Sequence, residues 1–274
     1  MATLVTFHAH PDDEAIATGG TMALAAAAGH RVILVTATRG EHGEPVPGVL
    51  RDGEQLWERR VVETHAAAEA LGVERVAFLG YVDSGMMGEP TNDDPACFWQ
   101  ADLDEAAERL ATILRDEGAD VLTVYDDHGG YGHPDHIQVH RVGHRAAELA
   151  GVAVVYEATM NRDAIRRAMA EVTAEMTADI GEDQAERMER VVEEEFGSPE
   201  ALITHGVDVT SVLAAKRAAM VAHASQIADD SWFLQMDDET FGRAFGTEWF
   251  IRVGAPRAEG AAMGGDLFAG VPVS

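Results

Sequence analysis

The stretch His8-Ala9-His10-Pro11-Asp12-Asp13-Glu14 stands between two different hydrophobic patterns. An apolar, β-prone run, residues 2–7, leads into it, and a run of small residues with helical character, 15–28, leads away. Two imidazoles and three carboxylates are therefore expected where a strand ends and a helix begins. In an open α/β sheet, ligands bind in the crevice beyond the carboxyl ends of the strands. The stretch thus predicts a strand-to-helix turn that carries a site.

The first half of the chain alternates between strand and helix patterns, which predicts βαβ units and a parallel sheet. The loops after the second, third and fourth strands are long and polar, as loops that carry function are. Expected strands are 4–7, 31–36, 76–79, 121–125 and 152–156, and expected helices are 14–28, 54–71, 102–117 and 133–150.

The C-terminal third has a different character. Residues 162–196 are highly charged and helical in pattern, with a break at Gly181, and 260 onward reads as loosely ordered, although Leu267-Phe268 can dock. We expect one α/β domain, 1–274, in which a catalytic core, 1–160, precedes a helical, partly β elaboration, 161–274. Within the elaboration, strands are expected at 203–209 and 249–253 and a helix at 211–223.

Composition excludes several partners. Twenty basic against 48 acidic residues give a formal net charge of −28, which repels nucleic acid and anionic membranes. The single cysteine, Cys97, permits no intrachain disulfide. No signal-peptide pattern and no apolar run of about 20 residues occurs. We therefore expect a cytoplasmic protein that acts on a small molecule, without membrane or nucleic-acid partners, and we leave a homo-oligomer open.

A second stretch rich in histidine follows the fourth expected strand: Gly129-Gly130-Tyr131-Gly132-His133-Pro134-Asp135-His136. Spacings of three and four residues place four imidazoles along one face of the next helix. Such a face indicates either a metal site or a solvated surface. The four residues are His133, His136, His140 and His144.

The two stretches together favour a metal site. Catalytic zinc takes three protein ligands from His, Asp and Glu and leaves one position for water. His10 and Asp13 can bind from one turn, and a histidine of the second stretch can complete the set, with His136 preferred and His140 as the rival. Two histidines and one aspartate also accept Fe(II).

The remaining polar residues of the two stretches suit acid–base chemistry. Asp12, left free beside the metal, is expected to act as general base. His133, held by Asp135, is expected to stabilise an oxyanion, and either His133 or Asp12 is expected to protonate a leaving amine. Helix capping alone would explain Asp12 or Glu14, since acids favour a helix N-terminus, but it would not explain the neighbouring imidazole. His8 is expected to pack or hydrogen-bond rather than to bind metal.

Residues 9–14 and 130–136 resemble the two motifs of the LmbE-like, or PIG-L, family of zinc-dependent N-deacetylases, in the family's order. The resemblance covers about the first 160 residues and resumes at 222–227. It implies a Rossmann-like, three-layer α/β fold and hydrolysis of an amide on an N-acylated aminosugar. It implies zinc on His10, Asp13 and His136, Asp12 as general base, His133 at the oxyanion with Asp135 orienting it, and Tyr131 near the scissile amide.

Within the family, the sequence looks most like the mycothiol-pathway deacetylase, which acts on N-acetylglucosaminyl-inositol, and the mycothiol S-conjugate amidase. This likeness implies hydrogen bonds between substrate hydroxyls and the side chains of Glu44, Arg60, Asp83 and Gln226, with His223 as a further candidate. The amidase carries a lysine where this chain has Ala17, and residues 160–200 match neither relative. A deacetylase is therefore expected, with the amidase or a deacetylase of an antibiotic precursor as the alternative.

Two other classes of function fit the motifs less well. A dinucleotide-binding oxidoreductase would need a Gly-x-Gly-x-x-Gly turn after the first strand, where His-Pro-Asp-Asp stands instead. A sugar-binding module without catalysis would have no need of Asp12 or His133.

Overall fold

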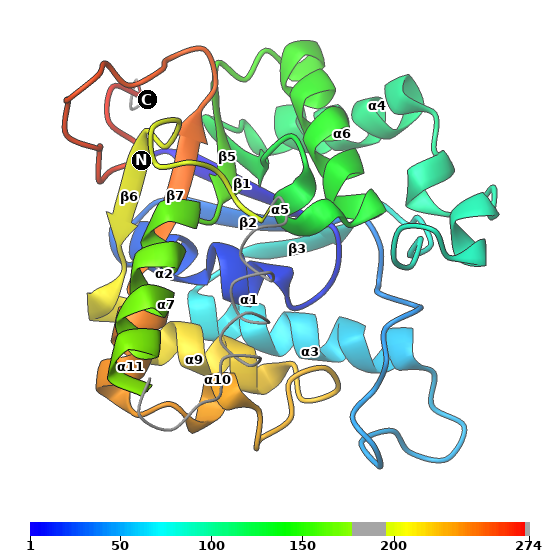
Figure 1. Cartoon of the computed structure of the whole chain (residues 1–274). Coiled ribbons are helices and arrows are strands. Elements are labelled where there is room, and N and C mark those ends of the chain that lie inside the picture. The colour runs from blue at the N-terminus through cyan, green and yellow to red at the C-terminus, as the bar shows by residue number, and fades with distance from the viewer. Residues whose placement is uncertain (177–195, 272–274) are drawn as a thin grey trace.

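A computed structural model describes residues 1–176 and 196–271 of the chain. Its centre is a seven-stranded sheet with the order β3-β2-β1-β4-β5-β7-β6 (Figure 1). The strands are β1 Thr3–His8, β2 Arg31–Thr36, β3 Arg75–Phe78, β4 Val121–Tyr125, β5 Val154–Thr159, β6 His205–Asp208 and β7 Thr247–Arg252.

The sheet is mostly parallel, which confirms the expected fold class. β1 pairs in parallel with β2 and β4, β2 with β3, and β4 with β5. The C-terminal strand β7 pairs antiparallel with β5 and with β6. The elaboration therefore extends the same sheet. Because β1 and β4 are neighbours, the two motif stretches leave the sheet side by side at its carboxyl edge.

Helices cover both faces of the sheet (Figure 1), with α4 and α6 on one face and α2, α3 and α9 on the other. The alternation of β1 divides the core between these layers: Leu4 packs in the α2–α3–α9 layer, whereas Val5 and Phe7 pack in the α4–α6 layer. The α-helices are α1 Asp13–Ala17, α2 Gly19–Ala27, α3 Leu56–Leu71, α4 Leu103–Glu117, α5 Gly129–Gly132, α6 Pro134–Ala150, α7 Arg162–Met176, α9 Leu213–Ala222, α10 Trp232–Gln235 and α11 Asp238–Phe245.

The expectation of one continuous helix over 14–28 is wrong. The chain breaks at Thr18, whose φ is −136°, and α2 begins a new helix at Gly19. The carboxylate of Glu248, on β7, accepts hydrogen bonds from the backbone N–H groups of Gly20 at 2.7 Å and Thr21 at 2.8 Å. It thereby satisfies the free N–H groups of the second helix.

A buried lysine completes this contact. Lys216, the only lysine of the chain, is 1% exposed; its Nζ donates to Glu248 and, at 2.7 Å, to the carbonyl of Ile16. The lysine therefore neutralises the buried carboxylate and satisfies a carbonyl at the end of α1. The break between α1 and α2 is produced by contacts from residues more than 190 positions away, which no local pattern reports.

The C-terminal third contains the expected strands and the expected helix, as β6, β7 and α9. The helix over 162–196 is present up to Met176, and residues 177–195 with Gly181 lie outside the described part. The two helices α10 and α11 were not expected. Leu267 is buried and the Phe268 ring stacks on His30 at 3.9 Å, so this part of the tail docks. None of the helices in the described ranges is long and apolar enough to cross a bilayer.

Candidate metal and catalytic site

The turn after β1 is narrow and held by its own side chains. The carboxylate of Asp13 accepts a hydrogen bond from the backbone N–H of His10 at 2.9 Å, which closes the turn. Asp12 precedes α1 with φ at +95° and is the one described non-glycine residue with positive φ. Left-handed backbone of this kind costs about 1–3 kcal/mol and is concentrated at functional sites. The turn therefore holds Asp12 in a conformation that its neighbours must enforce.

The second stretch, residues 129–136, approaches the turn after β1 through a glycine-rich loop and the first turn of α6. His133 is the N-cap of α6 and Pro134 its first residue, where a proline costs the helix nothing. Gly129, at φ +67°, packs against α6 so closely that a Cβ there would lie 2.5 Å from the Cβ of His136. Asp126 pins the loop, because its carboxylate accepts from Gly130 N at 2.6 Å. The position of His136 therefore depends on the absence of a side chain at Gly129.

Replacing Gly129 with alanine is expected to lower zinc affinity and turnover by about 10–100-fold, the range for changes that displace the surroundings of a metal ligand. Gly132→Ala is the matched control, because Gly132 also has positive φ, +89°, but a Cβ there meets nothing within 4 Å. Both variants carry backbone strain, and only the first displaces His136. Zinc titration of both proteins checks this; equal losses in the two would contradict it.

Three donor atoms from the two stretches converge. The Asp13 Oδ2 atom lies 3.4 Å from His10 Nδ1 and 3.4 Å from His136 Nε2. Zinc–ligand bonds of 2.0–2.2 Å in tetrahedral geometry place two ligand atoms about 3.4 Å apart. The His10, Asp13 and His136 side chains are at most 15% exposed. Two edges of the predicted set therefore have the length expected of a metal shell, and the set stays a prediction. In the described residues, the groups around His10 whose ligand atoms all lie within 4.8 Å of one another are His10 with His133 and His136, and His10 with Asp83 and Asp135.

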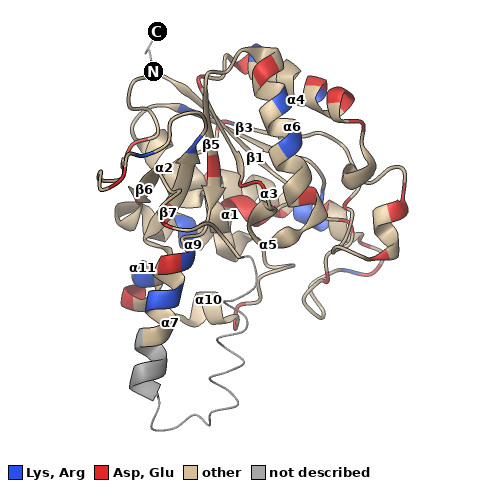
Figure 2. Ribbon diagram, turned by 45° about the horizontal axis from the view of Figure 1, so that its top comes forward, with Lys and Arg blue, Asp and Glu red and all other residues tan. Residues whose placement is uncertain are grey.

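Negative charge is concentrated around this set. Figure 2 shows acidic residues over helices and loops of the described chain, including those of α1 beside the site. Burial favours the neutral form of His10, but hydrogen bonds with Asp13, Asp135 and Asp83 outweigh it and raise the pKa of His10 well above its usual value. Burial likewise opposes the ionised form of Asp13, and His136 and His10 overcome it and lower its pKa. The site therefore favours a positive charge at its centre.

The carboxylate of Asp135 does not hold His133, which differs from the expectation. It accepts from His10 Nε2 at 3.1 Å and from the backbone N–H and hydroxyl of Ser84. Asp135 is fully buried, and it fixes the ring of a metal-set histidine so that Nδ1 faces Asp13. Sequence reasoning missed Ser84, because the loop after β3 brings it into place.

His133 is oriented by a backbone group instead. Its Nδ1 accepts from the Asp135 N–H at 3.1 Å, so the neutral ring carries its proton on Nε2. Burial, together with the nearby His10 and His136, lowers the pKa of His133 to about 4. The ring lies 4.6 Å from that of His10, centroid to centroid. At neutral pH His133 therefore presents a neutral N–H donor beside the donor set.

Asp12 stays outside the donor set and is held by Arg60. The Arg60 Nη2 atom lies 3.1 Å from Asp12 Oδ2 and also donates to the Pro11 carbonyl, and Nη1 donates to Gly40 O at 3.0 Å. Arg60 is 3% exposed. In the structure this guanidinium positions the candidate base, and its contact with substrate hydroxyls stays a prediction.

Two buried side chains, Glu14 and, from the C-terminal third, His223, fix the backbone of Asp12 through a chain of hydrogen bonds. Glu14 Oε2 accepts from the Asp12 N–H at 3.0 Å, and Glu14 Oε1 lies 2.6 Å from His223 Nε2. Glu14 and His223 are both fully buried. His223 therefore supports the strained turn through Glu14 and does not face a substrate.

Replacing Arg60 with methionine is expected to move the acidic limb of the kcat/KM profile to higher pH. Burial raises the pKa of Asp12 to about 6, and the charge of Arg60 works against this rise. Without the guanidinium the pKa rises further, and a base that must be deprotonated then works only at higher pH. Arg59→Met, which removes a guanidinium paired with Glu54, is the control. A pH–rate profile measures the shift, and an unmoved limb would show that Asp12 is not the titrating group.

The remaining expected substrate residues lie near the site to different degrees. Asp83 is 5% exposed, lies 3.4 Å from His10 Nε2 and accepts from the His42 N–H. Gln226 stands beside Arg60, since a Cβ on Gly43 would meet both side chains within 2.8 Å. Glu44 is exposed in the loop 38–53. Tyr131, 46% exposed, places its hydroxyl 3.4 Å from His136 Nε2.

The contacts of two further histidines show that neither belongs to the donor set. His8 is fully hydrogen-bonded, to Tyr125 Oη at 2.8 Å and Thr18 Oγ1 at 2.9 Å, as expected for a packed residue. His140, the rival ligand, bonds to the carbonyl of Tyr125 at 3.1 Å and lies away from the donor set. Tyr125 was missed, although its ring stacks on His136 at 4.4 Å. Its position at the end of β4 was the available signal.

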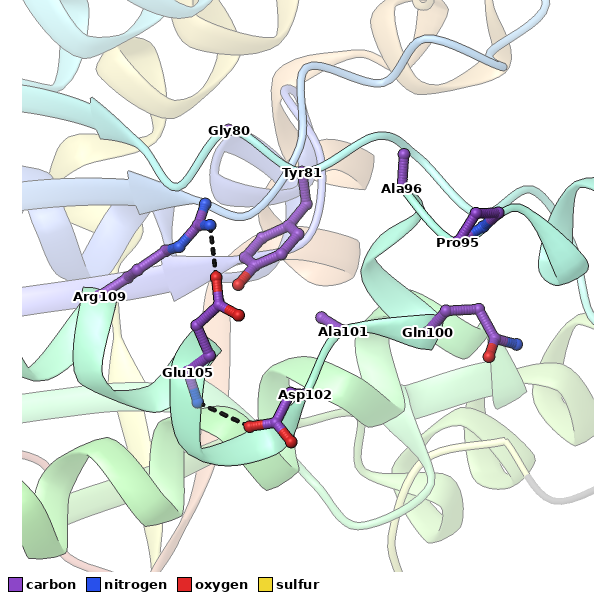
Figure 3. A pocket seen from close by; sticks show the side chains of 9 residues that line it. All are labelled: Gly80, Tyr81, Pro95, Ala96, Gln100, Ala101, Asp102, Glu105 and Arg109. Atoms are coloured by element: carbon purple, nitrogen blue, oxygen red, sulfur yellow. Dashed lines mark hydrogen bonds and ion pairs between the residues drawn. The ribbon is translucent and has the colours of Figure 1, made fainter.

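A separate hollow beside α4 contains none of these groups (Figure 3). The Arg109 guanidinium lies over the Tyr81 ring at 4.6 Å and bonds to Glu105 at 2.7 Å. Arg109 and Glu105 are thus paired with each other, and the Asp102 carboxylate caps α4 by accepting from the Glu105 N–H at 3.0 Å. Its lining residues are Gly80, Tyr81, Pro95, Ala96, Gln100, Ala101, Asp102, Glu105 and Arg109.

Known proteins resemble this chain in sequence and in fold. A protein named 1D-myo-inositol 2-acetamido-2-deoxy-alpha-D-glucopyranoside deacetylase from Salinispora arenicola is 44% identical over 99% of this chain and 92% of its own length. An N,N'-diacetylchitobiose deacetylase from Pyrococcus horikoshii has the same fold, with TM-score 0.56, 23% identity, and coverage of 92% of this chain and 83% of its own.

The fold alone does not set the reaction. GalB, a 4-carboxy-2-hydroxymuconate hydratase from Pseudomonas putida, superposes with TM-score 0.56 at 20% identity over 96% of this chain and all of its own. The family assignment therefore rests on sequence. The family model described as "PIG-L: GlcNAc-PI de-N-acetylase" matches residues 5–147, which include both motif stretches. The chain belongs to the PIG-L de-N-acetylase family.

Proposed function

We propose that the chain is a zinc-dependent N-deacetylase that converts 1D-myo-inositol 2-acetamido-2-deoxy-α-D-glucopyranoside into the free amine and acetate. The observation that carries the reaction type is a carboxylate, Asp12, that lies outside the His–Asp–His donor set in the same turn and is held by Arg60. The substrate is supported by the relative that is 44% identical over 99% of the chain and is named for this deacetylation.

His10, Asp13 and His136 would hold the metal. Bound there, a divalent ion supplies Lewis acidity, which polarises a carbonyl and lowers the pKa of water toward about 7. His10 is prepared for this role, because Asp135 takes its Nε2 and leaves Nδ1 facing Asp13. Two imidazoles and one carboxylate form a set that zinc accepts.

Asp12 and His133 divide the proton transfers. Asp12 accepts a proton from the water whose oxygen forms a bond to the amide carbon. The Nε2–H of His133 donates to the carbonyl oxygen as negative charge develops on it. The amide C–N bond then breaks, and the proton held on Asp12 passes to the amine nitrogen. A neutral His133, with its pKa lowered to about 4, keeps its N–H and leaves proton delivery to Asp12.

An amine-release assay tests this function. The protein, with zinc and with chelator, is given N-acetylglucosaminyl-inositol, N-acetylglucosamine, a mycothiol S-conjugate and 4-carboxy-2-hydroxymuconate. We expect zinc-dependent amine release, fastest with the inositol conjugate. Faster cleavage of the mycothiol conjugate would reassign the substrate, and hydration of the muconate without amine release would overturn the reaction type.

A further inference from the structure

A second group of metal-ligand side chains lies one helical turn beyond His136. His140 and His144 stand four residues apart on α6, and Glu157 stands on the neighbouring strand β5. One potential ligand atom from each of the three lies within 4.8 Å of the other two. The proposed deacetylase mechanism uses none of these side chains.

The spacing of the group is that of a coordination shell. His144 Nε2 lies 2.9 Å and His140 Nδ1 lies 3.5 Å from the same oxygen, Glu157 Oε1. These distances bracket the edge of about 3.4 Å expected between ligands on tetrahedral zinc. The two imidazole rings are 4.3 Å apart, centroid to centroid. Two histidines at i and i+4 on a helix with a glutamate from another element form a known type of zinc set.

The surroundings suit a bound ion. The three side chains are 16–29% exposed, so they are partly removed from water yet leave room for a further ligand. Tyr125 holds the His140 ring near Glu157, because the Tyr125 carbonyl oxygen lies 3.1 Å from His140 Nδ1. Without an ion, His144 Nε2 bonds to Glu157 Oε1 at 2.9 Å and His140 Nδ1 bonds to the Tyr125 carbonyl.

We propose that His140, His144 and Glu157 form a second zinc site, distinct from the His10–Asp13–His136 set. One nitrogen from each imidazole and one oxygen of Glu157 bind the ion, and water completes the shell. The ion joins α6 to β5. This proposal stands independently of the deacetylase assignment, because it concerns zinc binding alone.

Zinc counting tests the proposal. The purified protein is dialysed against excess zinc and then buffer, and bound zinc per folded chain is measured by mass spectrometry of the metal. We expect one ion at each set in the native chain. His144→Ala and Glu157→Gln should each remove one ion, as should His136→Ala, and the double variant His136→Ala/His144→Ala should bind none. His65→Ala, an exposed histidine on α3, is the matched control and should keep both ions.

Thermal melting supplies a second readout that needs no activity. In His136→Ala, added zinc should still raise Tm, because the ion binds the folded chain and not the unfolded one. Adding His144→Ala should abolish that rise. The proposal is overturned if the native chain binds one ion only, or if bound zinc and the zinc-dependent Tm rise persist in His136→Ala/His144→Ala with native circular dichroism.

Discussion

Replacing Asp12 with asparagine is expected to reduce kcat by about 10²–10⁴-fold, the contribution of a positioned general base, while zinc content stays at the native level. The loss follows because the amide cannot accept the proton of the attacking water. Zinc stays because Asp12 is bound to Arg60 and to no part of the donor set. The substitution removes little volume, so the fold should persist.

Single-turnover kinetics and metal analysis of the same preparation measure the two effects. Asp238→Asn is the control, since Asp238 is fully exposed on α11. Near-native turnover in Asp12→Asn would show that another group accepts the proton. Loss of zinc together with activity would place Asp12 among the ligands.

Replacing His136 with alanine is expected to abolish turnover through the metal, by at least about 10³-fold, since Lewis-acid stabilisation is worth several kcal/mol and each 1.4 kcal/mol is tenfold. His136 supplies one of three donors and also receives the stacked ring of Tyr125. Removing His136 leaves only His10 and Asp13. A set of two ligands binds zinc weakly.

Turnover recovered on titrating metal-free protein with zinc measures this loss, and His65→Ala serves again as the exposed control. Saturable recovery of native turnover in His136→Ala, at native zinc affinity, would contradict the ligand set. Asp12→Asn and His136→Ala therefore separate the base from the metal: the first loses chemistry and keeps zinc, and the second loses both.

Much of the donor set could be predicted because its geometry is local or topological. His10 and Asp13 are three residues apart in one turn, so their proximity follows from the sequence. His136 joins them because β1 and β4 are adjacent parallel strands, whose carboxyl ends meet. The alternation of strand and helix patterns predicts β1 and β4. It also predicts α6, which starts within one residue of its expected position.

The partners of each side chain could not be predicted in this way. The carboxylate of Asp135 bonds to His10 because Ser84, on a loop without regular structure, fixes its orientation. The guanidinium of Arg60 turns toward Asp12 because Pro11 and Gly40 present carbonyls there. Such choices depend on rotamers and loop paths, which hydrophobic periodicity does not encode.

The contacts between the C-terminal third and the α1–α2 segment have a consequence for chimeras of related chains. Glu248, Lys216 and His223 all come from the last quarter of the sequence, and all attach to residues 14–21. A chimera that exchanges the C-terminal third between relatives is expected to lose activity even when both parents are active and every donor residue is retained. Activity should return when residues 14–21 are exchanged together with the C-terminal third. These two distant segments must therefore come from the same parent.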